Sequence, residues 1–226
     1  MARSVTHPTT SVYFERMQDP RLEPAAVGAA LAAAGCPVAP DVAEALSTYL
    51  RLLVKWNRTY NLTGIRDPDE LVERHLVESL ALAPLLRGER IADVGTGAGL
   101  PGIPLAIVAP ERRFVLIESR AKRVRFLRHV VLTLGLENTE IAHTRVEDLR
   151  CERPFDTVLA RAVAPPEALV QMTRHLTAPG TILLLLTATR LEQEWRASAA
   201  QFGLRPLELD LPARPGRSAI VMLERC

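Results

Sequence analysis

The chain up to about residue 88 has the hydrophobic periodicity of helices. Apolar side chains recur at spacings of three and four from Val42 to Trp56, which predicts an amphipathic helix. Asp41 and Glu44 predict its start as a capping box. A second helix is predicted after Asp67, where a capping side chain precedes a proline and two acids. Its apolar stripe consists of Leu71, Val72, Leu76 and Leu80.

Beyond residue 88, short apolar runs alternate with helical stretches. The predicted strands are Arg90–Val94, Phe114–Glu118, Glu140–His143, Thr157–Ala160, Thr181–Leu186, Pro206–Leu209 and Ala219–Leu223. The segments between the first five are long enough for crossover helices, which favours a parallel, doubly wound sheet. Only a loop separates the last two, so we expect an antiparallel hairpin at a sheet edge. This α/β layout of seven mostly parallel strands resembles that of class I (Rossmann-like) methyltransferases.

The change of periodicity divides the chain into three parts. Residues 1–20 are polar at their start and are expected to be a disordered N-terminus. Residues 21–88 form a small helical unit, which also contains an alanine-rich helix over residues 24–34 that ends at Gly35 and Pro37. Residues 89–226 form the α/β domain, expected to be the catalytic one.

Composition narrows the class of protein. The 226 residues carry 28 basic and 26 acidic side chains, for a net charge of +2, which excludes a histone-like basic protein. Lys55 and Lys122 are the only lysines, a bias that we attribute to coding preference rather than to function. Aromatic residues make up 4%, which argues against a surface of stacking rings.

Cysteine usage and hydropathy indicate a cytoplasmic protein. Cys36, Cys151 and Cys226 are far apart and match no disulfide framework or metal-ligand spacing, so we expect reduced thiols and no metal. The N-terminus has no apolar stretch of the signal-peptide kind. The longest aliphatic run, Ile182 to Leu186, is too short to span a bilayer, so no membrane segment is expected.

A glycine-rich loop carries the strongest local signal. It runs from Asp93 to Gly102 between the first strand and a helix, with glycines that let the backbone turn sharply and approach a ligand. Gly97, Gly99 and Gly102 also satisfy the dinucleotide pattern G-x-G-x-x-G. Asp93 lies two residues before the first glycine, Gly95, where it can either orient the amides of the loop or accept from a cationic ligand. It would attract a positively charged tail and repel a pyrophosphate. The loop therefore favours S-adenosylmethionine, with a dinucleotide and a plain tight turn as alternatives.

Two acidic sites follow along the chain. Glu118 ends the second strand about twenty residues after the loop, where such folds place a carboxylate on ribose hydroxyls. The alternative is a solvated carboxylate. The segment from Arg145 to Asp148 follows the third strand, where an acid and backbone amides can read an adenine edge. Alone it is also typical of a helix N-terminus.

Several segments together carry a resemblance to a family. They are residues 56–63 (WNRTYNLT), 74–80 (RHLVESL), 100–106 (LPGIPLA), Glu118-Ser119 with Lys122-Arg123 and Phe126-Leu127, 145–147 (RVE), and Phe155-Asp156 with Arg161-Ala162. The chain resembles the RsmG type (glucose-inhibited division protein B) of bacterial small-subunit rRNA guanine-N7 methyltransferases over roughly residues 50–165. Several of these segments lie outside the cofactor loop, which makes the resemblance more specific than any glycine motif.

The resemblance implies a substrate, a cofactor and site residues. The methyl acceptor would be N7 of the guanine that the family's name places at position 527 of 16S rRNA, presented by the RNA or the small ribosomal subunit. The donor would be S-adenosyl-L-methionine. Gly95, Leu100, Val146, Glu147 and Arg161 would contact it, together with the Gly97, Gly99 and Glu118 already named. The family usually has Asp where Glu78 stands, and a lysine-glycine pair where residues 187–190 read Thr-Ala-Thr-Arg.

Guanine N7 methylation also fits what the sequence lacks. N7 carries a lone pair and no proton, so attack on a methyl group needs no general base. We therefore expect no catalytic acid–base residue, with Arg161 as a base-orienting side chain or a strand-end salt bridge. The residues after the fourth strand, 160–166, show no Asn/Asp-Pro-Pro-aromatic set, which argues against adenine-N6 transfer.

Basic residues follow Glu118 on one predicted helix. Arg120, Lys122, Arg123 and Arg125, with Arg128, form a candidate phosphate track, or alternatively a solvated helix face. His75 is expected to be a satisfied polar residue at the seam between the two units, or else to touch RNA or the cofactor. We expect a monomer. The rival functions are methylation of another RNA or a small molecule, a dinucleotide-dependent oxidoreductase, and a silent RNA-binding adaptor.

Overall fold

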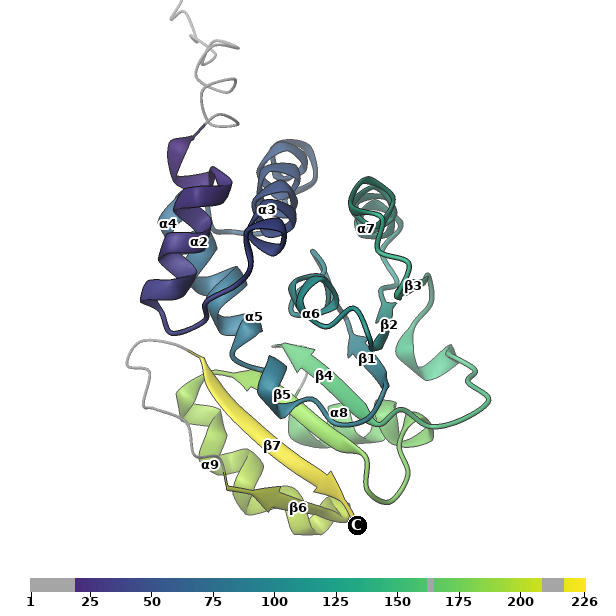
Figure 1. Cartoon of the computed structure of the whole chain (residues 1–226). Helices are drawn as coiled ribbons and strands as arrows, with labels where there is room; N and C mark the ends of the chain where they lie inside the picture. Colours follow the sequence, from purple (N-terminus) through teal and green to yellow (C-terminus); the bar gives the residue numbers. More distant parts are fainter. Residues whose placement is uncertain (1–18, 162–164, 209–217) are drawn as a thin grey trace, which may run out of the picture.

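The centre of the molecule is a twisted seven-stranded sheet (Figure 1). A computed structural model describes residues 19–161, 165–208 and 218–226. The strands are β1 (Arg90–Val94), β2 (Arg113–Ile117), β3 (Thr139–Ala142), β4 (Thr157–Arg161), β5 (Ile182–Thr187), β6 (Leu204–Leu207) and β7 (Ala219–Arg225). Nearly all of the N-terminus that we expected to be disordered lies outside the described residues.

The strand order is β3-β2-β1-β4-β5-β7-β6. The first five strands of this order pair in parallel, β7 is antiparallel to β5, and β6 is antiparallel to β7. The predicted fold class is therefore confirmed. The terminal hairpin is present, with β7 inserted between β5 and the edge strand β6. Strands β1 to β3 are added toward one edge of the sheet and β4 onward toward the other, so the strand order reverses between β1 and β4. Ligands of open α/β sheets bind at such a switch point.

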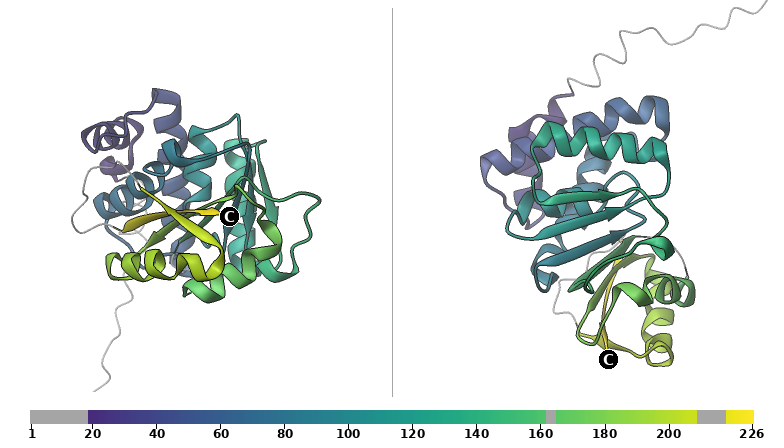
Figure 2. Two further views of the ribbon diagram at one scale, coloured as in Figure 1. Left: turned by 90° about the horizontal axis from the view of Figure 1, so that it is seen from below. Right: turned by 90° about the vertical axis from the view of Figure 1, so that its right-hand side faces the viewer.

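Helices cover both faces of the sheet. They are α2 (Pro24–Ala33), α3 (Pro40–Tyr60), α4 (Pro68–Leu71), the π-helical turn η2 (Val72–Val77), α5 (Glu78–Leu80), α6 (Gly102–Val108), α7 (Ala121–Leu134), α8 (Pro166–Thr173) and α9 (Thr189–Ser198). The 3₁₀ turns are Pro20–Leu22, Ala83–Leu85, Val146–Asp148, Arg174–Leu176 and Ala199–Phe202. One core joins the N-terminal helices, α6 and α7 to one face of the sheet, and a second core joins α8 and α9 to the other face (Figure 2).

Two of the predicted local structures differ from the observed ones. Helix α3 begins at Pro40 with Ala39 as an N-cap that makes no side-chain bond, so the capping box at Asp41 is wrong. Proline at the first helical position fixes φ and needs no partner for an N–H. Between β3 and β4 the chain forms only the 3₁₀ turn Val146–Asp148, because this polar stretch has too few apolar side chains to bury a crossover helix. The predicted cap at Asp67 is confirmed, since its carboxylate accepts from two backbone N–H groups.

Helix α3 connects the N-terminal helices to the glycine loop. Tyr49 is fully buried, and its hydroxyl donates a hydrogen bond to the carbonyl oxygen of Ala98 at 2.9 Å. Its ring packs near that of Phe126 on α7, with ring centroids 6.5 Å apart. The loop is thus held from the N-terminal helices as well as from the sheet. No helix among the described residues is long and apolar enough to cross a bilayer.

Candidate functional site

A cleft of about 580 Å³ lies at the carboxyl ends of β1, β2 and β4. It is lined by Leu62, Thr63, Ile65, His75, Gly95, Thr96, Gly97, Ala98, Leu100, Glu118, Ser119, Arg120, Arg123 and Arg161. The predicted residues Gly95, Gly97, Leu100, Glu118 and Arg161 therefore meet in one place, although they come from three strand ends. The volume lies within the range of about 300–1,000 Å³ that small-molecule sites occupy.

The glycine loop turns through left-handed backbone. Gly95 and Gly97 have φ of +63° and +62°, a conformation that other residues rarely adopt. A Cβ atom at Gly97 would meet no heavy atom closer than 3.7 Å, so the space beside this backbone is open. Gly99 has a different role, because a Cβ there would lie 2.4 Å from the Ile103 side chain. Gly99 allows the loop to pack on α6, and it does not line the cleft.

Asp93 holds the loop from beneath. Its carboxylate is completely buried, and its Oδ2 accepts hydrogen bonds from the Thr96 hydroxyl at 2.5 Å and the Gly102 N–H at 2.8 Å. Asp93 does not line the cleft, so of its two expected roles the geometry supports orientation of the loop rather than contact with a cationic ligand. Its Oδ1 has no hydrogen-bond partner in the described part of the chain. Burial raises the pKa of Asp93 from 3.8 to about 7, and the bonds from Thr96 and Gly102 partly oppose this rise.

The raised pKa of Asp93 predicts a pH dependence of stability. The folded protein holds this proton between pH 4 and 7 while the unfolded chain loses it, so the free energy of unfolding falls as pH rises through this window. We expect Asp93→Asn to remove this fall, which amounts to at most about 4 kcal/mol. Urea unfolding of both proteins at pH 4.5 and 7.5, values chosen near the ends of this window, measures it.

Comparing the pH dependence of stability in wild type and Asp93→Asn cancels the contribution of His75, which has the opposite sign. Burial and the charge of Arg161 lower the pKa of His75 to about 4, so its contribution to stability rises from pH 4 to 6.5 in both proteins. An equal pH slope in wild type and Asp93→Asn would contradict the assignment to Asp93.

Glu118 organises the second strand end. Its side chain is 4% exposed, and Oε1 accepts from the Arg120 N–H at 2.8 Å. Oε2 accepts from the Gly97 N–H and from Nη1 of Arg123, both at 3.2 Å. Glu118 therefore joins the glycine loop to the start of α7, and its carboxylate faces the cleft where a ribose hydroxyl is expected.

A buried ion cluster lies at the end of β4. Glu78 is 2% exposed, and its carboxylate lies 3.3 Å from Nη2 of Arg161 and 3.2 Å from Nε of Arg74. The backbone N–H and hydroxyl of Ser218 also donate to it. The ion pair at the strand end is thus present, and Arg161 lines the cleft as well. Its Nη1 is buried and has no partner within residues 19–161, 165–208 and 218–226, so this donor can serve a ligand.

The segment between α3 and α4 forms the remaining wall of the cleft. Asn57 fixes this segment at both hydrogen-bonding atoms: its amide Nδ2 donates to the carbonyl of Thr63 and its Oδ1 accepts from the N–H of Thr63, each at 2.9 Å. The Thr63 hydroxyl pairs with Nε2 of His75 at 2.9 Å and accepts from the Ile65 N–H. His75 is buried and lines the cleft. Its Nε2 is paired, but its Nδ1 has no hydrogen-bond partner among the described residues, so the expectation of a fully satisfied residue is wrong, and its contact with RNA or the cofactor stays a prediction.

Other expected site residues lie away from this cleft. Val146 is buried in the second core and Glu147 is exposed beside it, and neither lines the cleft, so their contact with an adenine stays a prediction. Lys122 and Arg125 are exposed on α7 outside the cleft, and the guanidinium of Arg125 lies 5.9 Å from the ring centre of Tyr60. The side chain of Arg190, where the family has its lysine-glycine pair, lies outside the described residues.

Some residues of the site were not assigned from the sequence. Leu62, Thr63, Ile65 and Ala98 line the cleft, and Glu78 neutralises Arg161. Residues 61–63 and Glu78 belong to segments that resemble the family, which was the available signal. Their roles depend on contacts between distant parts of the chain.

The positions of Arg123 and Arg125 predict different effects of the two side chains on donor binding and on RNA binding. Reversing the charge of both residues would combine two effects, because Arg123 contacts Glu118 and Arg125 does not. We expect Arg125→Glu with Lys122→Glu to weaken RNA association about tenfold or more and to leave donor affinity unchanged. Arg123→Glu should lower donor affinity. Filter binding of RNA and calorimetry with the donor measure the two quantities, and an equal loss of both in the Lys122/Arg125 variant would contradict this division.

The residues of the cleft fit S-adenosylmethionine. The open backbone at Gly97 leaves room for the methionine part of the molecule, and the Glu118 carboxylate can accept from its ribose hydroxyls. The Nη1 group of Arg161, which has no partner among the described residues, can donate to the methionine carboxylate. Among the described residues, no group of three or more His, Cys, Asp or Glu side chains is arranged to hold a metal ion. Strand order, glycine loop and acidic strand end together define a class I methyltransferase that uses S-adenosyl-L-methionine.

Comparison with known sequences gives the family. The family model GidB, described as rRNA small subunit methyltransferase G, matches residues 42–209. The chain is 45% identical over 185 residues to the ribosomal RNA small subunit methyltransferase G of Ectopseudomonas mendocina, covering 80% of this chain and 86% of the relative. It is 42% identical over 192 residues to that of Shigella dysenteriae, covering 84% and 93%. The chain belongs to the GidB family, as the sequence resemblance predicted.

Solved structures support the fold. Magnesium protoporphyrin IX methyltransferase from Synechocystis, crystallised with bound SAM, matches with a TM-score of 0.58 and 16% identity, covering 79% of this chain and 97% of that one. A SAM-dependent methyltransferase from Aquifex aeolicus matches with a TM-score of 0.56 and 18% identity, covering 73% and 96%. At these identities the likeness concerns the architecture alone.

Proposed function

We propose that this protein methylates N7 of guanine 527 in 16S rRNA of the small ribosomal subunit. Membership of the GidB family supports a small-subunit rRNA substrate, because the relatives carry that activity in their names. The position and the atom rest on the resemblance of the segments quoted above. The single observation that supports the chemistry is the cleft itself, where the glycine loop, Glu118 and the guanidinium of Arg161 meet.

The residues of the cleft supply position and electrostatics. S-adenosyl-L-methionine brings an activated methyl group, so the protein has only to align the acceptor nitrogen with it. The glycine loop and Glu118 would hold the donor. His75 lines the cleft but is neutral at pH 7, because its pKa is about 4. It therefore adds no charge beside the positively charged purine that methylation of N7 produces.

Arg161 would orient the acceptor or the carboxylate of the donor. Glu78, which is itself paired with Arg74, holds the guanidinium of Arg161, so the Nη1 donor is positioned before a ligand arrives. Such preorganisation lowers the cost of alignment in the reaction. No proton is transferred by any of these residues in the methylation step.

The proposal extends to the setting of the enzyme. We infer a monomer that acts in the cytoplasm, where 16S rRNA and the small subunit are found.

The direct test maps modified bases in cells. Deletion of the gene should abolish 7-methylguanosine at position 527 of 16S rRNA, and expression of this chain should restore it. Chemical cleavage at 7-methylguanosine followed by primer extension locates the base. An unchanged signal in the deletion strain, or a lost methyl group at another position, would refute the assignment.

A further inference from the structure

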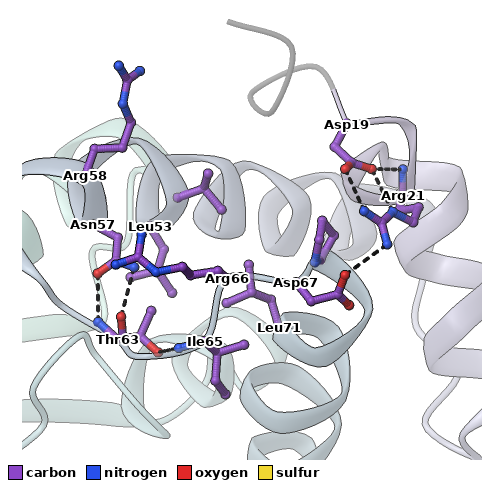
Figure 3. Close-up of a pocket in the computed structure, with 12 residues that line it drawn as sticks. Asp19, Arg21, Leu53, Asn57, Arg58, Thr63, Ile65, Arg66, Asp67 and Leu71 are labelled. Carbon is purple, nitrogen blue, oxygen red and sulfur yellow. Dashed lines mark hydrogen bonds and ion pairs between the residues drawn. The ribbon is translucent and has the colours of Figure 1, made fainter. Parts of the chain in front are cut away.

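A second cavity of about 250 Å³ lies behind the wall of the donor cleft (Figure 3). We call it the helix pocket, because it is bounded by the end of α3, the segment 63–67 and the start of α4. Thr63 and Ile65 line both cavities. A group bound in the helix pocket would therefore lie against the same backbone segment that faces the methyl donor.

The inner surface of the helix pocket is apolar. Leu53 and Leu71 are at most 1% exposed, Pro68 is buried, and Val54 and Ile65 are half-buried beside them. The volume lies just below the range of drug-sized sites, which suits a single planar ring system. Flat aliphatic surface of this kind accepts the face of a nucleobase.

Charge is distributed unevenly around the helix pocket. Arg66 lies across it toward Asn57, and Arg58 projects outward from α3 at the same end (Figure 3). At the other end Asp67 is paired with Arg21 at 3.2 Å, and Arg21 also pairs with Asp19 at 2.9 Å and Asp69 at 2.8 Å. Arg21 therefore partly neutralises the acidic end, and Arg66 carries its positive charge toward Asn57 at the other end.

The wall between the two cavities is rigid. Asn57 is 7% exposed and bonds both the N–H and the carbonyl of Thr63, and the Thr63 hydroxyl is held by His75. A preformed wall reduces the ordering cost when a ligand binds.

From this geometry we infer that the helix pocket is a subsite for one unpaired nucleotide of the RNA substrate, next in space to the methylated base. Its base lies between the guanidinium of Arg66 and the apolar floor, and its phosphate contacts Arg58 and Arg66. Proteins read single-stranded RNA through bases stacked on arginine planes and apolar surface. The inference rests on the proposed function for the identity of the RNA, and on the helix pocket itself for the subsite.

Charge reversal at Arg66 tests the subsite, with Arg113→Glu as the matched control. Arg113 is exposed at the start of β2, at the amino ends of the parallel strands, whereas the donor cleft lies at their carboxyl ends. We expect Arg66→Glu to raise the KM for small subunits about tenfold, to leave the Kd for the methyl donor within about twofold, and to flatten the salt slope of RNA binding by about one. Arg66→Lys should recover part of the loss. Equal behaviour of Arg66→Glu and Arg113→Glu would overturn the subsite.

Filling the helix pocket provides a second, independent variant. Val54→Trp places a large ring in the pocket, and Thr59→Trp places one at an exposed position on the same helix. We expect only Val54→Trp to weaken binding of a single-stranded RNA fragment, measured by fluorescence anisotropy without methyl donor, with the melting temperature retained. If wild type binds the RNA fragment but does not methylate small subunits, the proposed function fails while this test of the subsite stands.

Titration with free guanosine monophosphate distinguishes an RNA subsite from a site for a small nucleotide. Weak binding of the free nucleotide, together with loss of RNA affinity in Arg66→Glu, supports the inference. Tight, Arg66-dependent binding of the free nucleotide with unchanged RNA affinity would show a small-molecule site and would overturn it.

Discussion

Replacing Gly102 by alanine is expected to disrupt both the glycine loop and the fold beneath it. A Cβ atom at this position would lie 2.4 Å from Cδ2 of Leu116 and 2.6 Å from Oδ2 of Asp93. Neither neighbour can retreat easily, because both belong to strands of the sheet and are fully buried. We expect Gly102→Ala to lower the free energy of unfolding by about 1–3 kcal/mol. Donor affinity should fall about tenfold or more, a loss of about 1.4 kcal/mol.

Gly28→Ala is the matched control for this substitution. Gly28 lies inside α2, where an added Cβ atom meets only Cβ of Ala43 at an ordinary 3.4 Å. Alanine should stabilise the helix there by about 0.5–1 kcal/mol and leave donor binding unchanged. Urea unfolding and calorimetry with S-adenosylmethionine measure both variants. Wild-type donor affinity in Gly102→Ala would show that the loop tolerates displacement of Asp93.

Removal of the Glu78 carboxylate is expected to be the most costly change near the site. Glu78→Ala leaves the mostly buried guanidinium of Arg161 without its acidic partner, and the more exposed Arg74 loses the same partner. Breaking a buried ion pair by deletion of one partner costs about 3–5 kcal/mol. Arg161 would also lose its fixed orientation, so methyl transfer should fall even at temperatures where the variant is folded.

Two further substitutions calibrate the effect of Glu78→Ala. Glu111→Ala removes an exposed pair with Arg112, which should cost no more than about 1 kcal/mol. Glu78→Asp keeps the charge on a shorter side chain, the residue that the family usually has, and should retain most of the activity. If Glu78→Ala unfolds at the same urea concentration as Glu111→Ala, the cluster contributes nothing to stability.

The sequence predicted the parts of this molecule that depend on local patterns. The parallel, doubly wound sheet follows from alternating strands and helices, and the glycine loop with Glu118 follows from short motifs at strand ends. The capping box at Asp41 failed because Pro40 already begins the helix without a side-chain cap. The loss of a helix between β3 and β4 depends on how little apolar surface that segment can bury.

The site also depends on contacts that no local pattern encodes. Glu78 meets Arg161 across 83 positions of sequence and meets Ser218 across 140. The wall formed by residues 62–65 reaches the cleft because Asn57 and His75 hold Thr63 from two different elements. The motif left two roles open for Asp93, orientation of the loop and contact with a cationic ligand. The structure places its carboxylate under the loop, because only the folded packing shows which side of the strand end is buried.

The hydrogen bond from Tyr49 to the Ala98 carbonyl has a consequence for protein engineering. A chimera whose first third comes from another methyltransferase must place a tyrosine hydroxyl within hydrogen-bonding distance of the Ala98 carbonyl. Without it, an inward-facing carbonyl of the ligand-binding turn loses its bond, and the graft is weakened where the two halves join. The N-terminal helices and the sheet should therefore be exchanged together when such a chimera is designed.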